Sequence, residues 1–204
     1  ICPYCDNKLE KVSDIEKLKS DVSSRKLNFH EIWDAAIEIQ TEDCSGSGFF
    51  ISNTGHVLTN SHVVSQSSKV IKGLLGRGKL KIELKLIKDF QTSNNTDLSI
   101  LQVVDYNSKG IKPLEFEDDQ NIDAGHTVYT IGNGSDQGLA LVKGTISRIE
   151  SGKYIQANMI INPGNSGGVL FNSNGKVVGV LKHILEGYDG MTFAIKNSIV
   201  IPLV

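Results

Sequence analysis

The chain has 204 residues, of which 39% are hydrophobic and 22% are charged, and its formal net charge at pH 7 is −2. This composition is typical of a globular protein with a sizeable core. The near-neutral charge and the pI of about 6.2 exclude the electrostatic signature of a dedicated nucleic-acid or anionic-membrane binder. No stretch approaches the ~18 consecutive apolar residues that a membrane-spanning helix needs.

The cysteines are few and lie in two places. Cys2 and Cys5 form a C-x-x-C pair, which is half of a zinc ribbon. A structural zinc at this terminus and a metal-free terminus are equal alternatives, because two of the four ligands would have to come from elsewhere. With Cys44 as the third, the chain has no disulfide framework, which favours a cytoplasmic location. A periplasmic or secreted location stays open because the chain does not begin with methionine.

The N-terminal extension, residues 1–33, has helical periodicity. Between residues 6 and 24, apolar residues recur every three or four positions among charged ones, at Leu9, Val12, Ile15, Leu18 and Val22. This spacing predicts an amphipathic helix. The helix either covers the body of the protein or contacts another copy or a regulatory partner. A second short helix is predicted over 29–33.

The rest of the chain is typical of an all-β protein. Twenty glycines and four prolines separate short apolar runs. The clearest is 80–86, where apolar and charged residues alternate with period two. No helical pattern of 10–15 residues interrupts the runs, which argues against βαβ units. Strands are predicted over 36–39, 48–51, 80–86, 98–104, 127–131, 139–142, 145–149, 176–181 and 192–195.

Three segments carry a candidate catalytic histidine, aspartate and serine, namely His62, Asp97 and Ser166. A serine hydroxyl is a weak nucleophile and needs an adjacent base, which a histidine supplies. A buried carboxylate then orients the imidazole and stabilises its charged form. An oxyanion hole is expected at Gly164, Asn165 and Ser166, with the backbone N–H groups of Gly164 and Ser166 as the expected donors.

These segments, in this order, resemble the trypsin-like serine endopeptidases of the chymotrypsin fold, and among them the HtrA (Deg) branch. The resemblance is carried by 46–64 (GSGFFISNTGHVLTNSHVV), 96–101 (TDLSIL) and 154–180 (YIQANMIINPGNSGGVLFNSNGKVVGV). It implies a protease domain over 34–204, built of two six-stranded antiparallel β-barrels at about 34–110 and 120–200, with the catalytic groups at their junction. It also implies hydrolysis of peptide bonds in protein or peptide substrates through an acyl-enzyme, with no cofactor for catalysis.

The resemblance further implies which residues meet the substrate. The floor of the specificity pocket would be Ile160, which predicts an apolar P1 residue in the substrate. Leu181, Lys182 and His183 would form the edge that pairs with the substrate backbone as an added strand. Cys44 has no partner cysteine beside His62 and is expected to be a small buried residue.

Other features limit what the resemblance implies. Asn165 stands where secreted relatives carry an aspartate, so Ile1 is not expected to act as an activation terminus. No PDZ domain is expected within this chain. The acidic run at 115–123 is predicted to be a solvated connector between the barrels. A protease-like scaffold with an unproductive triad and a partner-activated processing protease are the alternative functions.

Overall fold

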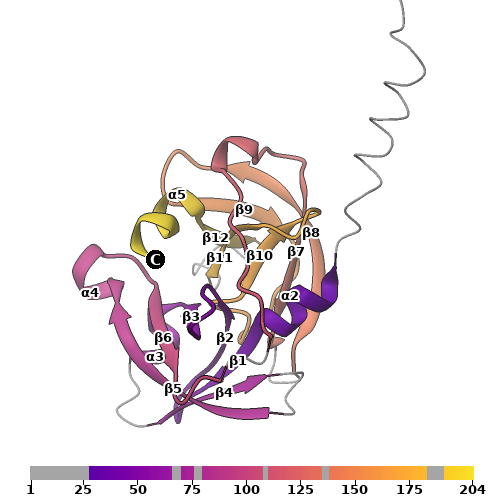
Figure 1. The fold of residues 1–204 in the computed structure, drawn as a ribbon. Coiled ribbons are helices and arrows are strands. Elements are labelled where there is room, and N and C mark those ends of the chain that lie inside the picture. Colours follow the sequence, from indigo (N-terminus) through magenta and orange to yellow (C-terminus); the bar gives the residue numbers. More distant parts are fainter. Residues whose placement is uncertain (1–27, 66–69, 76–79, 108–109, 135–137, 183–190) are drawn as a thin grey trace, which may run out of the picture.

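The computed structural model describes residues 28–65, 70–75, 80–107, 110–134, 138–182 and 191–204 (Figure 1). Within these ranges, twelve strands close into two antiparallel β-barrels of six strands each, which confirms the all-β, two-barrel prediction. The predicted N-terminal amphipathic helix, the Cys2–Cys5 pair and His183 lie outside the described residues, so the predictions made for them stay predictions.

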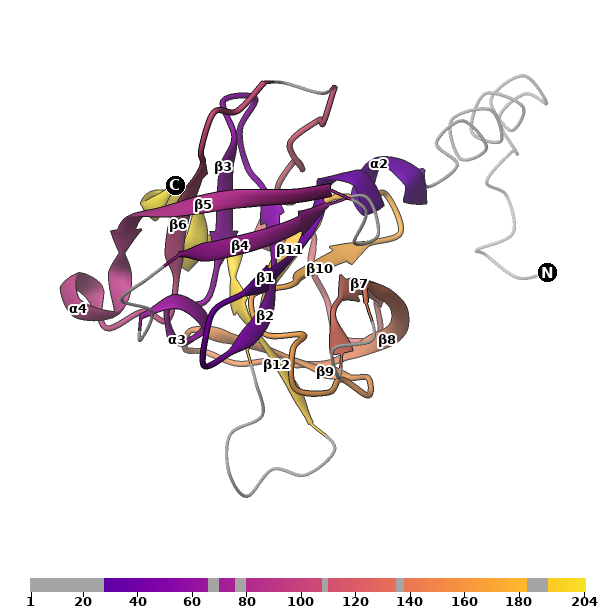
Figure 2. The same ribbon diagram turned by 90° about the horizontal axis from the view of Figure 1, so that it is seen from below.

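The first barrel has the strand order β1-β2-β3-β6-β5-β4 (Figure 2). Its strands are β1 (Ala36–Gln40), β2 (Ser45–Phe50), β3 (His56–Thr59), β4 (Ile71–Leu75), β5 (Leu80–Asp89) and β6 (Ser99–Val103). The second barrel has the order β10-β11-β12-β9-β8-β7. Its strands are β7 (Thr127–Gly132), β8 (Ala140–Ile149), β9 (Tyr154–Asn158), β10 (Val169–Asn172), β11 (Val177–Lys182) and β12 (Thr192–Lys196).

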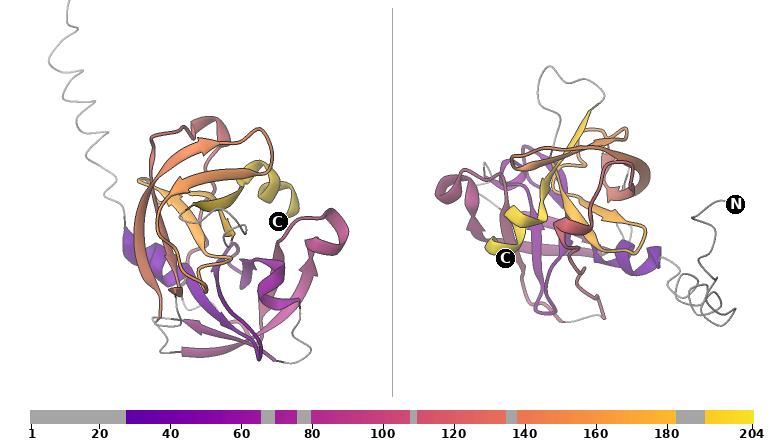
Figure 3. Two further views of the ribbon diagram at one scale, coloured as in Figure 1. Left: turned by 180° about the vertical axis from the view of Figure 1, so that it is seen from behind. Right: turned by 90° about the horizontal axis from the view of Figure 1, so that it is seen from above.

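Short helices and 3-10 turns lie at the ends of the barrels. The helices are α2 (Phe29–Ala35), α3 (Ser61–Val64), α4 (Phe90–Asn94) and α5 (Asn197–Val200), and the 3-10 turns are η1 (Asp119–Asn121) and η3 (Ile201–Leu203). Figure 3 shows α5 on the side of the molecule away from α2. None of the helices in the described ranges is long and apolar enough to cross a membrane.

Strand β8 is continuous where the sequence predicts two strands, 139–142 and 145–149. The break was predicted around Gly144, because glycine usually punctuates strands. In the structure, a Cβ at Gly144 would lie 2.5 Å from Cβ of Met159 and 2.6 Å from the carbonyl oxygen of Asn158. Gly144 therefore lets two strands approach closely and does not end one of them. Strands β3, β4, β9 and β10 were not predicted as separate elements.

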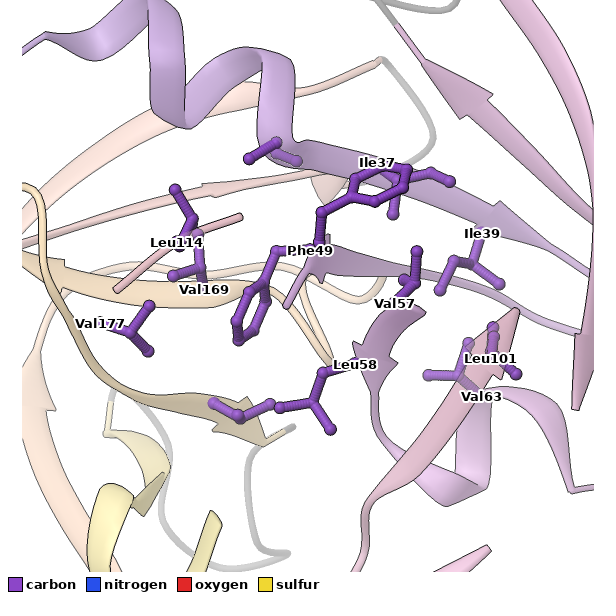
Figure 4. Close-up of a cluster of buried hydrophobic side chains, with 14 of the residues drawn as sticks. Ile37, Ile39, Phe49, Val57, Leu58, Val63, Leu101, Leu114, Val169 and Val177 are labelled. Atoms are coloured by element: carbon purple, nitrogen blue, oxygen red, sulfur yellow. The ribbon is translucent and has the colours of Figure 1, made fainter. Parts of the chain in front are cut away.

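One hydrophobic cluster spans both barrels and joins them. Figure 4 shows Phe49 and Leu58 of the first barrel close to Val169 and Val177 of the second. Leu114, from the connecting segment, belongs to the same cluster. Because close-packed interiors resist deformation, this shared core fixes the orientation of the barrels and hence of the loops at their junction.

Helix α2 adds a second contact between the barrels. Ile32 and Ala35 are buried, and α2 leads directly into β1 of the first barrel. Phe29 lies edge-on to Tyr129 of β7, with ring centroids 5.6 Å apart, and also contacts Phe171 of β10. Aromatic pairs in this geometry are stabilising beyond the area that they bury. We infer that α2 helps to hold the first barrel against the second.

The acidic connector is not wholly solvated, which corrects the prediction at Glu117. This side chain is 8% exposed, and its oxygens accept hydrogen bonds from the side chains of Asn121 (3.1 Å) and Asn172 (2.8 Å) and from the backbone N–H of Asp118 (3.1 Å). Burial alone would raise the pKa of Glu117, but these hydrogen bonds and the charge of Lys176 outweigh it and hold the pKa below the ordinary value.

Replacing Glu117 with glutamine is expected to lower the free energy of unfolding by about 1–3 kcal/mol at pH 7. The amide NH2 must face at least one of the N–H donors that the carboxylate now accepts. Because the folded-state pKa is depressed, the contribution of the carboxylate is present above about pH 4.5, its unfolded value, and is lost as the pH falls through the folded-state pKa. Urea unfolding should therefore give a larger difference between variant and wild type at pH 7 than at pH 3.5. Glu115→Gln, at an exposed position, is the control and should change neither.

Cys44 is exposed, which corrects the prediction that it is buried. It ends the tight turn between β1 and β2, where its backbone N–H donates to Oγ1 of Thr41 at 3.0 Å and its carbonyl accepts the N–H of Thr41 at 2.9 Å. The backbone of Cys44 is thus held in the turn while its side chain faces solvent. Loop ends of this kind lie at the surface of a barrel.

Candidate active site

Three loops bring the predicted catalytic residues to the junction of the barrels. His62 lies on α3, directly after β3, and Asp97 lies between α4 and β6, so both come from the first barrel. Ser166 precedes β10 of the second barrel. Its carbonyl accepts the N–H of Ser47 on β2 at 2.8 Å, which places the serine loop against the first barrel.

The serine loop also packs directly on the residues before His62. A Cβ added at Gly167 would lie 2.3 Å from Oγ1 of Thr59 and 2.9 Å from the backbone nitrogen of Asn60. Asn60 caps α3, and His62 is its second residue. Ser166 and His62 therefore belong to segments in van der Waals contact, although they are far apart in the sequence.

His62 and Asp97 are joined by two hydrogen bonds. Nδ1 of His62 lies 2.8 Å from Oδ2 of Asp97, and the backbone N–H of His62 donates to Oδ1 at 3.0 Å. An ionised carboxylate only accepts, so the proton of a neutral ring sits on Nδ1 and Nε2 is left able to accept one. The aspartate side chain is 9% exposed and the histidine side chain 42%, so the ring has one buried and one open side.

The charge on Asp97 is stabilised within the site. Burial would raise the pKa of this carboxyl, but the hydrogen bonds from the ring and backbone of His62, together with the charges of His62 and Lys182, hold the pKa below its ordinary value. The backbone is also fixed, because Nδ2 of Asn60 donates to the carbonyl of Asp97 at 2.8 Å. Ser61 donates to the carbonyl of Leu98 at 2.7 Å and so ties α3 to the same segment.

The segment before Ser166 forms a tight turn. The backbone N–H of Asn165 donates to the carbonyl of Asn162 at 3.1 Å, with Pro163 and Gly164 between them, and Gly164 has φ +97°. Proline followed by a glycine of positive φ is typical of a type II turn. Among the described residues, no hydrogen bond acceptor is recorded for the backbone N–H groups of Gly164 and Ser166. The assignment of these two N–H groups to an oxyanion hole stays a prediction.

Asn165 stabilises the turn through its own hydrogen bonds. Its side chain is 3% exposed, and its Nδ2, like its backbone N–H, donates to the carbonyl of Asn162. Of the three residues expected at the oxyanion hole, Asn165 is thus the one whose backbone N–H already donates within the turn. Sequence reasoning missed Ser47, whose Oγ donates to the carbonyl of Gly164 at 2.7 Å and accepts the N–H of Asn133 at 2.8 Å. The only sequence signal for it is its place inside the 46–64 motif.

The predicted pocket floor is wrong. Ile160 is 82% exposed, whereas its neighbours Met159 and Ile161 are 4% and 6% exposed and pack into the second barrel. Alternation along extended chain sends neighbouring side chains to opposite sides, so an error of one position moves a residue from the core to solvent. Leu181 is fully buried, and its carbonyl accepts the N–H of Gly167 at 2.9 Å, which places it beside the serine loop.

The substrate-edge role predicted for Lys182 concerns its backbone and stays a prediction. Its side chain contacts Asp97, with Nζ 3.7 Å from Oδ2. Within the described part of the chain, no group of three or more His, Cys, Asp or Glu side chains is arranged to hold a metal ion. The zinc prediction concerns Cys2 and Cys5, which are not among the described residues.

The two barrels and the loops at their junction form a peptidase-like domain of the chymotrypsin fold. The family described as a trypsin-like peptidase domain matches residues 46–180, and the chain belongs to this family. A DegP-like "probable periplasmic serine endoprotease" from Pseudomonas putida is 37% identical over 166 residues, covering 76% of this chain and 33% of that protein. A protein of the same name from Halomonas elongata is 34% identical over 160 residues, covering 74% of this chain and 32% of that protein.

Solved structures agree with this assignment. The serine endoprotease from Yersinia pestis aligns with a TM-score of 0.73 and 25% identity, covering 86% of this chain and 64% of that one. The HtrA-type protease AlgW, solved with a tripeptide, aligns with the same TM-score and identity and covers 86% of this chain and 62% of that one. The chain spans about a third of the length of the curated relatives above. Their names place those relatives in the periplasm, so the cytoplasmic location favoured by the sequence gains no support from them.

Proposed function

We propose that this chain hydrolyses peptide bonds in protein substrates through His62, Asp97 and Ser166, with an acyl-enzyme intermediate. The observation that carries the proposal is the buried Asp97 carboxylate, which lies 2.8 Å from Nδ1 of His62. His62 is on α3, and the segment that leads into α3 packs against the loop of Ser166. In acyl transfer, a carboxylate in this position orients the imidazole and stabilises its charged form while the imidazole takes the proton of a serine hydroxyl.

The proposed reaction proceeds in two halves. Oγ of Ser166 attacks the scissile carbonyl carbon while its proton passes to Nε2 of His62, and the carbonyl oxygen becomes an oxyanion. The backbone N–H groups of Gly164 and Ser166 donate to that oxyanion. The C–N bond breaks as His62 returns the proton to the leaving amine. Water then loses a proton to His62 and attacks the acyl-enzyme, which releases the carboxylic acid and regenerates the serine hydroxyl.

The proposed specificity is for an apolar P1 side chain. With Ile160 facing solvent, the support comes from Ile161, an apolar side chain that is 6% exposed and lies directly before the turn that leads to Ser166. Such a side chain offers no partner for a charged P1 group, whose desolvation would be uncompensated. Cleavage of a peptide library should show P1 valine, leucine or alanine favoured over lysine and aspartate by about 10²-fold or more in kcat/KM.

A fluorophosphonate probe tests the nucleophile, because it labels only a serine activated by an adjacent base. The wild-type protein should be labelled, and Ser166→Ala should not. Ser173→Ala removes an exposed hydroxyl from the turn after β10 and should be labelled as strongly as wild type. Absence of labelling in wild type, also in the presence of denatured protein substrate, would contradict the proposal and favour the scaffold alternative.

A further inference from the structure

Lys182 brings a cation close to the carboxylate of the proposed triad. It is the last residue of β11, and its side chain is 24% exposed. Its Nζ lies 3.7 Å from Oδ2 of Asp97, 3.4 Å from the hydroxyl of Tyr154, and 5.6 Å from the centroid of the Tyr154 ring. The tyrosine face and the carboxylate together hold the ammonium group in place.

The ammonium and the imidazole share one oxygen atom. Oδ2 of Asp97 lies 2.8 Å from Nδ1 of His62 and 3.7 Å from Nζ of Lys182. The carboxylate that would stabilise a protonated His62 is therefore already partly neutralised by a second cation. Two positive charges around one buried carboxylate disfavour each other.

Two other charged groups near the triad, Lys153 and Asp89, interact with groups other than the carboxylate of Asp97. Lys153 lines the same cavity of about 160 Å³ as Lys182 and Asp97, but its Nζ donates to the carbonyl of Asn95 at 2.8 Å. Asp89, at the end of β5, accepts the hydroxyl of Ser61 and so interacts with α3 through that neutral group. Among the described residues, Lys182 is thus the cation recorded in contact with the carboxylate of Asp97.

We propose that Lys182 is a positioning residue that acts through Asp97, keeping the carboxylate ionised and His62 neutral at lower pH than the His–Asp pair alone would allow. The inference rests on the proposed function for the role of His62 as base. It gives Lys182 a role other than the substrate contact that the sequence predicts for it. Since the base must be unprotonated to accept the serine proton, the lysine extends activity toward acidic pH.

Lys182→Met keeps the length of the side chain and removes the charge. The acid limb of the pH profile of kcat/KM should move to higher pH by about 0.5–1 unit, which is about a 3–10-fold loss of activity below the midpoint and little change above it. Lys182→Arg, which keeps a cation, should restore the acid limb toward its wild-type position. Lys153→Met removes the same charge from the same cavity without a contact to Asp97, and should shift the limb much less.

A second measurement separates this inference from the proposed function. The midpoint at which the His62 ring takes up its proton can be followed by NMR in the inactive Ser166→Ala protein, with and without Lys182→Met. An upward shift of this midpoint in Lys182→Met supports the role of the lysine whatever the activity. An unchanged midpoint, or an equal shift in Lys153→Met, overturns it. Full activity of Ser166→Ala would instead overturn the proposed function.

Discussion

Replacing Asp97 with asparagine is expected to lower kcat by about 10⁴-fold while leaving the fold intact. In the wild-type chain, Oδ1 accepts the backbone N–H of His62 at 3.0 Å and Oδ2 accepts its ring Nδ1 at 2.8 Å. A backbone N–H can only donate, so the asparagine must turn its single oxygen toward it. Its NH2 group then faces Nδ1 of His62 and holds that nitrogen as an acceptor. The ring proton is forced onto Nε2, which can no longer take the proton of Ser166.

Peptide hydrolysis and the thermal midpoint of unfolding should both be measured for this variant. Asp105→Asn is a matched control, because Asp105 is exposed and its φ of +52° is one that asparagine tolerates well. The control removes the same charge and should keep wild-type kcat. Activity of Asp97→Asn within about tenfold of wild type would show that the pair does not set the tautomer of the ring, and the proposed mechanism would fail.

Gly167→Ala is expected to destabilise the protein by about 3–5 kcal/mol and to abolish activity with it. The residue has φ +82°, which costs about 1–2 kcal/mol for a residue with a Cβ. A Cβ at Gly167 would in addition lie 2.3 Å from the carbonyl oxygen of Ser47 and 2.3 Å from Oγ1 of Thr59. Both neighbours belong to the first barrel, so the serine loop must move away from it.

Gly125→Ala separates backbone strain from the clash. Gly125 has φ +91°, but nothing lies within 4 Å of a Cβ built on it. Urea unfolding should give a loss of about 1–2 kcal/mol for Gly125→Ala and a clearly larger one for Gly167→Ala. Equal losses would mean that the serine loop yields easily, and the tight seating of Ser166 against the first barrel would be refuted.

Sequence reasoning predicted most of what depends on local signals. The alternation at 80–86 gave strand β5, and the order of His62, Asp97 and Ser166 indicated the class of enzyme. The predictions that failed concern how a residue packs against the rest of the chain. Ile160 was one position from a buried residue, Gly144 was taken for a turn when it allows close packing, and Glu117 was taken for a solvated charge. Partners distant in the sequence decided the outcome for Gly144 (Met159) and Glu117 (Asn172), and the direction of alternation decided it for Ile160.

Lys182 is the clearest example of the difference between what local signals predict and what contacts with distant residues decide. In the sequence it is a lysine at the end of a strand, and nothing local distinguishes it from a residue at the substrate edge. Only the closure of the second barrel against the first places its ammonium 3.7 Å from Asp97, about 85 residues earlier in the chain.

The residue types and their spacing by themselves determined the chemistry available to this protein, because strand periodicity and the reactive side chains are properties of short segments. The tertiary structure alone decided which groups meet. The Asp97–His62 pair lies beside the serine loop because a shared hydrophobic core holds two closed barrels in one orientation. Contact between distant segments depends on packing of the whole chain, which no local pattern encodes.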